Sequence, residues 1–68
     1  MSGRDVGKLI REMRIRQGMS QERLAQKARL SRIYIAKLEA GERGSPSIPA
    51  LQRIARALGA KLKIDLVQ

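Results

Sequence analysis

The stretch SQERLAQKARLSRIYIAKLEAG, residues 20–41, contains the strongest indication of the fold class of this chain. Ser20 and Ser31 each stand directly before a short amphipathic segment, and a serine hydroxyl at that place can accept from the free N–H groups of a helix's first turn. Gly41 follows the second segment and supplies a helix stop. The stretch therefore predicts two short helices joined by a tight turn at Arg29-Leu30, which is a helix-turn-helix.

The two predicted helices each have one apolar face. These faces are made by Leu24, Ala25 and Ala28 in the first helix and by Ile35 and Leu38 in the second. The small alanines allow a following helix to cross closely. Packing Ile35 and Leu38 there leaves Arg32, Ile33 and Lys37 on the outer face of the second helix. A helix with basic residues near its exposed N-terminal end suits the DNA major groove, which admits one helix.

Composition supports a polyanionic partner. The 68-residue chain carries a formal charge of +9 with a pI near 11.5, which favours association with nucleic acid or another polyanion. Tyr34 is the only aromatic residue, and this scarcity argues against single-stranded nucleic acid, which is usually held by stacked aromatic rings. It also argues against a membrane-surface helix, and no apolar run approaches the ~20 residues of a membrane span.

Two further helices flank the central pair in the prediction. The first is capped by Asp5 and stopped by Gly18, and its buried stripe is Val6, Leu9, Ile10 and Met13. The last follows the cap Ser47 and stops at Gly59, with an inner face formed by Ile48, Leu51, Ile54, Ala55 and Leu58. We expect a mainly α, compact four-helix domain within a single domain spanning residues 1–68, in which residues 5–59 form the helix-turn-helix unit.

The C-terminal residues 60–68 change period. KLKIDLV alternates polar and apolar residues, which is typical of a half-buried β-strand. Since no other segment reads as a strand, we expect pairing with the same strand of a second chain, with Leu62, Ile64 and Leu66 at the dimer interface. A frayed tail and a short fifth helix are the alternatives.

Several segments together resemble the Cro/cI-like (XRE-type) helix-turn-helix regulators. VGKLIREMR resembles that family's first helix, GMSQERLAQKA the start of its second, LSRIYIAKLEAG its recognition helix and SPSIPALQRIARALG its fourth helix. Some DNA-binding antitoxins resemble the same plan with a C-terminal strand. One position departs from the family pattern, because Arg29 stands where the turn usually carries glycine. A left-handed backbone there would cost an L-residue roughly 1–2 kcal/mol.

The resemblance implies roles for particular residues. Matched position by position, the base-reading residues are Arg32, Ile33 and Lys37. Gln21 corresponds to a residue that contacts phosphate and supports the recognition helix, while Arg14 and Glu39 correspond to a structural pair. From the charge and loop pattern we expect further phosphate contacts from Arg11, Arg29, Tyr34, Arg43 and Gly44. Tyr34 has a second possible role, in which its ring covers the cap of the second helix of the pair.

The function predicted is a sequence-specific regulator of double-stranded DNA, a repressor that occupies a palindromic operator as a homodimer in the cytoplasm at the nucleoid. An antitoxin that also binds a toxin protein is one alternative, and a protein-binding adaptor is another. No catalytic role is expected, because the six carboxylates are scattered and histidine and cysteine are absent. We expect no cofactor, no metal, no small-molecule substrate and no membrane association.

Overall fold

The computed structural model describes residues 3–42 and 46–60 and contains four helices, α1 (Gly3–Arg16), α2 (Gln21–Ala28), α3 (Arg32–Glu39) and α4 (Ile48–Ala57). The prediction of a mainly α domain with these four helices is confirmed. The described ranges hold no strand. The strand and dimer interface predicted at Leu62, Ile64 and Leu66 lie outside the described residues.

Serine caps begin three of the four helices. Ser20, Ser31 and Ser47 each accept a hydrogen bond at Oγ from the backbone N–H three residues later, at 3.0, 3.0 and 3.3 Å. These bonds satisfy donors that the first helical turn would otherwise leave free. The prediction for Asp5 was wrong, because α1 begins at Gly3 and places Asp5 inside the first turn. There its carboxylate still suits the positive end of the helix dipole.

All four helices end in the same way. In each, one residue in the left-handed region is followed by a residue whose N–H bonds back to the carbonyl five positions earlier, as in Leu30 to Ala25 at 2.9 Å. This is the Schellman arrangement, which glycine adopts most easily. Three of the left-handed residues are Gly18, Gly41 and Gly59, with φ between 68° and 74°. The fourth, after α2, is Arg29, with φ 57° and ψ 44°.

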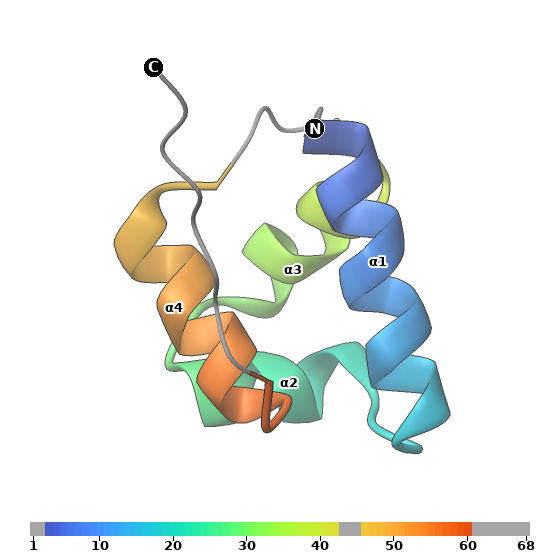
Figure 1. Ribbon diagram of the computed structural model, residues 1–68, viewed down its shortest axis with the longest axis vertical. Coiled ribbons are helices and arrows are strands. Elements are labelled where there is room, and N and C mark those ends of the chain that lie inside the picture. Colours follow the sequence, from blue (N-terminus) through green and yellow to red (C-terminus); the bar gives the residue numbers. More distant parts are fainter. Residues whose placement is uncertain (1–2, 43–45, 61–68) are drawn as a thin grey trace.

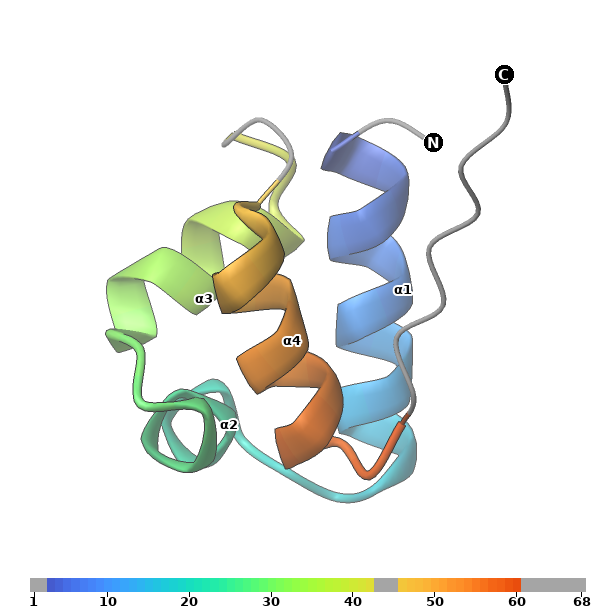
Figure 2. The same ribbon diagram turned by 60° about the vertical axis from the view of Figure 1, so that its left-hand side comes forward.

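The core lies where all four helices meet. Its fully buried large side chains are Leu24, Ile35, Leu38 and Ile54. Ala25 and Ala28 are buried on α2 as predicted. Contacts join α1 to α3 and join α2 to both α3 and α4. In Figure 2, α2 is seen almost end-on while α3 runs across the page, so the two meet at a steep angle. Figure 1 shows α1 and α4 on either side of this pair.

Two predicted core residues are on the surface. Leu9 is 46% exposed and Ile48 is 53% exposed. In α4 the inward face is set by Ala50, Ile54 and Ala57, and at about 100° per residue Ile48 lies on the opposite side from Ala50. Short alanines bring α4 close to α2, whereas an isoleucine at that position would hold the helices apart.

Candidate nucleic-acid interface

The two faces of α3 differ sharply in exposure. Ile35 and Leu38 are completely buried, whereas Ile33 is 62% exposed. Arg32 and Lys37 are exposed beside it. Since Ser31 holds the first turn in place, a guanidinium, an aliphatic side chain and an ammonium project together from a short helix anchored on its other side. These are the three residues predicted to read bases.

An ion pair fixes the far end of α3 to α1. The Arg14 guanidinium donates from Nε to Glu39 Oε2 at 2.8 Å and from Nη2 to Glu39 Oε1 at 2.9 Å. Its Nη1 donates to the Met19 carbonyl at 2.7 Å, which also holds the loop before α2. The Glu39 side chain is only 3% exposed and that of Arg14 11%. Hydrogen bonding to Glu39 raises the pKa of Arg14 above its ordinary value, against the opposing effect of burial.

Gln21 connects the start of α2 to the same carboxylate. Its Nε2 donates to Glu39 Oε1 at 3.3 Å, so Gln21 connects α2 to the end of α3. Gln21 and the exposed Arg11 also line a shallow hollow of about 220 Å³ over the ion pair. The structure therefore brings two of the predicted phosphate-contacting residues to one place beside α3.

Tyr34, Arg29 and the loop residues have different settings. Tyr34 is half-buried and packs against the core cluster. Arg29 is exposed in the turn between α2 and α3. Arg43 and Gly44 lie outside the described residues.

Two residues that position these elements were missed by sequence reasoning. Gly7 is buried where α1 crosses α3, and a Cβ built on it would lie 1.9 Å from the Leu38 carbonyl oxygen. Gln17 donates from Nε2 to the Leu58 carbonyl at 2.7 Å, joining the end of α1 to the end of α4. A glycine inside an apolar helical stripe was the one available signal, since it marks a close approach of backbones.

A steeply crossed helix pair with serine caps, a tight turn and a basic outward face defines a helix-turn-helix protein of the DNA-recognising kind. Similarity to known proteins supports this class. A helix-turn-helix family model, HTH_3, matches residues 10–64. The chain belongs to this helix-turn-helix family, the XRE-type DNA-binding transcriptional regulators.

Two curated relatives differ in how much of them the chain spans. It is 40% identical over 57 residues to an immunity repressor protein of Bacillus phage phi105, a match covering 84% of this chain and 39% of the repressor. It is 51% identical over 51 residues to an HTH-type transcriptional regulator of Methanothermobacter thermautotrophicus, covering 75% of this chain and 72% of that protein. The chain thus spans well under half of the phage repressor and most of the archaeal regulator.

Solved structures share the fold. The restriction-modification controller protein C.AhdI from Aeromonas hydrophila superposes with a TM-score of 0.82 at 34% identity, covering 87% of this chain and 88% of that one. The clp gene regulator ClgR from C. glutamicum gives a TM-score of 0.80 at 30% identity, covering 87% of this chain and 75% of that one.

The two curated relatives are named as an immunity repressor and a transcriptional regulator, and neither name is that of an enzyme. Within the described ranges, no group of three or more histidine, cysteine, aspartate or glutamate side chains could hold a metal ion. None of the helices described is long and apolar enough to cross a membrane.

Proposed function

We propose that this protein is a transcriptional repressor that occupies a palindromic operator in double-stranded DNA as a homodimer. The observation that carries the proposal is the polarity of α3, with Ile35 and Leu38 fully buried and Arg32, Ile33 and Lys37 exposed on one outward surface. A rigid, anchored helix with a basic outer face meets the dimensions and the chemistry of the major groove.

In this proposal three side chains of α3 contact the bases. Arg32 can donate both ends of its guanidinium fork to O6 and N7 of guanine, and Ile33 can contact a thymine methyl group. Lys37 lies one turn further along and reaches a neighbouring acceptor. The burial of Ile35 and Leu38 holds α3 in one orientation, so these side chains meet the groove at a defined angle.

Phosphate contacts position the helix in this proposal. Arg11 and Gln21 lie together beside α3 and can hold a phosphate next to the inserted helix, while Arg29 in the turn before α3 can hold another. The ion pair with Glu39 secures the geometry, because it connects α1, the loop before α2 and the end of α3. Tyr34, Arg43 and Gly44 stay in the proposal as further phosphate contacts on sequence grounds.

The dimer is proposed from the sequence of residues 60–68, through Leu62, Ile64 and Leu66. Two recognition helices related by a two-fold axis require half-site centres about one turn apart, or ~34 Å. Deleting residues 61–68 should convert a dimer to a monomer in sedimentation and weaken operator binding. A truncated protein that remains dimeric would move the interface elsewhere.

Repression is preferred to the other two readings. The named relatives and structural neighbours are a phage repressor, regulators and a restriction-modification controller, and these names do not support a toxin partner. An adaptor would present a more apolar face than the one formed by Arg32 and Lys37.

Selection of binding sites from random duplexes at ~150 mM salt tests the proposal, because non-specific attraction is screened there. We expect a palindromic motif, and Arg32→Ala or Lys37→Ala should each lose about 1–3 kcal/mol on it and relax preference at one position per half-site. Lys8→Ala, on the exposed side of α1, is the control and should select the wild-type motif. The same motif from the α3 variants would refute the assignment of α3.

A further inference from the structure

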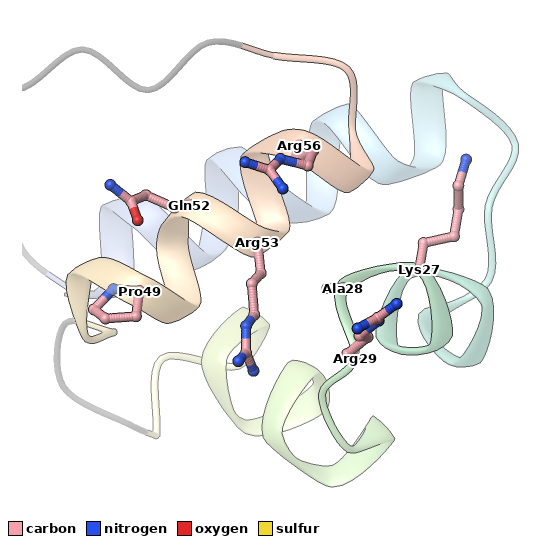
Figure 3. Close-up of a pocket in the computed structure, with 7 residues that line it drawn as sticks. All are labelled: Lys27, Ala28, Arg29, Pro49, Gln52, Arg53 and Arg56. Atoms are coloured by element: carbon pink, nitrogen blue, oxygen red, sulfur yellow. The ribbon is translucent and has the colours of Figure 1, made fainter.

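A second cationic site lies away from the outer face of α3. A hollow of about 500 Å³ separates the end of α2 from α4, and it is lined by Lys27, Ala28, Arg29, Pro49, Gln52, Arg53 and Arg56. In Figure 3 the side chains of Arg29, from the turn, and Arg53, from α4, come from opposite walls.

The charges around this hollow are all of one sign. Four of its seven lining residues are cations and none is a carboxylate. Within the described part of the chain, none of the four forms an ion pair. Helix dipoles account for two of them, since Lys27 lies in the last turn of α2 and Arg56 in the last turn of α4. Arg29 and Arg53 have no such explanation.

Arg29 points most directly to a ligand. It holds a left-handed conformation that the other three helix ends give to glycine, and such a conformation costs an arginine roughly 1–2 kcal/mol. Non-glycine residues in such strained conformations cluster at ligand-binding and other functional sites. Arg29 and Arg53 both line this hollow.

The chemistry favours phosphate as the ligand. Three of the four cations are arginines, whose planar forks match phosphate oxygens bidentately, and a chain of phosphates carries enough charge to engage several of them together. The apolar lining is limited to Ala28 and Pro49. An acidic peptide partner would need larger apolar anchors than these for stable docking.

We propose that the hollow between α2 and α4 is a phosphate-binding site distinct from the base-reading face of α3. The phosphates come from one of two sources, the DNA backbone beyond the bases that α3 reads or a free polyphosphate. The DNA source rests on the proposed function, whereas the free source does not. Because Arg29 ends α2 and lies in the turn that leads into α3, an anion in the hollow is positioned to affect how α3 meets DNA.

The test uses Arg53→Gln/Arg56→Gln in the full chain, with Lys8→Gln/Arg16→Gln on α1 as a control that removes equal charge. Titration with sodium tripolyphosphate, followed by backbone amide shifts, measures the free source. Affinity should fall about tenfold or more in the α4 variant and little in the control. Shifts in the wild type should centre on Arg29 and Arg53.

The slope of DNA affinity against salt measures the other source. It should become shallower by about 0.9 for each phosphate that the α4 variant no longer neutralises, while the selected motif stays the same. A change in either measurement supports the site and identifies its source. If neither differs from the control, or if a poly-glutamate peptide of equal charge binds as tightly as tripolyphosphate, the phosphate site is refuted. If the wild-type protein selects no DNA motif but still binds tripolyphosphate through this hollow, the result counts against the proposed function and leaves the phosphate site standing.

Discussion

Arginine side chains have opposite environments at the junction of α1 with α3 and in the hollow between α2 and α4. At the junction, Arg14 is nearly buried and makes three hydrogen bonds, two of them to Glu39. Around the hollow, Arg29 and Arg53 are exposed and have no carboxylate partner among the described residues. The first site neutralises its charge within the fold, and the second leaves its charge available to a ligand.

This difference separates stability from binding in a small basic protein. A charge that is paired inside contributes little to the external field, whereas unpaired cations at the surface attract polyanions. Substitutions at the junction should therefore change the free energy of unfolding first. Substitutions around the hollow should change binding while leaving the fold intact.

The largest effect is expected at the ion pair. Arg14→Met or Glu39→Leu leaves the other charge without its partner, at a cost of roughly 3–5 kcal/mol for a fully buried pair. The double variant should cost much less than the sum of the two, because it leaves no orphaned charge. Urea unfolding of the three variants measures this, with Arg16→Met as the exposed control. Strict additivity would show that the two residues do not interact.

Gly7 offers the next test of the junction. Gly7→Ala places a Cβ against the Leu38 carbonyl, a backbone atom that cannot move independently of α3. Forcing α1 and α3 apart should lower the free energy of unfolding by about 1–3 kcal/mol. Lys8→Ala, next to it and exposed, should change stability by less than ~0.5 kcal/mol. Equal effects at the two positions would argue against the close crossing.

Arg29 and Gly18 form a matched pair for the helix ends. Arg29→Gly removes the left-handed strain and should raise stability by about 1 kcal/mol, while weakening binding to DNA or tripolyphosphate. Gly18→Ala, at φ 70° with nothing within 4 Å of the new Cβ, should lower stability by a similar amount through the backbone alone. Thermal melts of both variants are sufficient. Changes of the same sign would show that backbone strain is not the cause.

The smallest effect on stability is expected on α4. Arg53 is exposed and forms no ion pair among the described residues, so the free energy of unfolding of Arg53→Gln should stay within ~0.5 kcal/mol of the wild type. Denaturant titration checks this alongside the binding measurements. A decrease of more than ~1 kcal/mol in the free energy of unfolding would show that Arg53 stabilises the fold, and would contradict the difference between the hollow and the junction.

Local signals in the sequence were sufficient for the elements of the fold. Ser20, Ser31 and Ser47 all cap helices, and the predicted stops at Gly18, Gly41 and Gly59 all take left-handed conformations. These features depend on hydrogen bonds within a few residues, so they can be read without a partner. The buried faces of α2 and α3 could also be predicted from the sequence, because their apolar residues are regularly spaced.

Contacts between segments that are distant in the sequence could be seen only in the folded chain. Leu9 and Ile48 looked like core residues but face outward, because close crossings at Gly7 and at the alanines of α4 set the rotation of each helix. The hollow unites Arg29 with Arg53, which are far apart in the chain. Periodicity shows that a helix has an apolar face; which residues complete that face, and which cations meet across a gap, depends on how the helices pack.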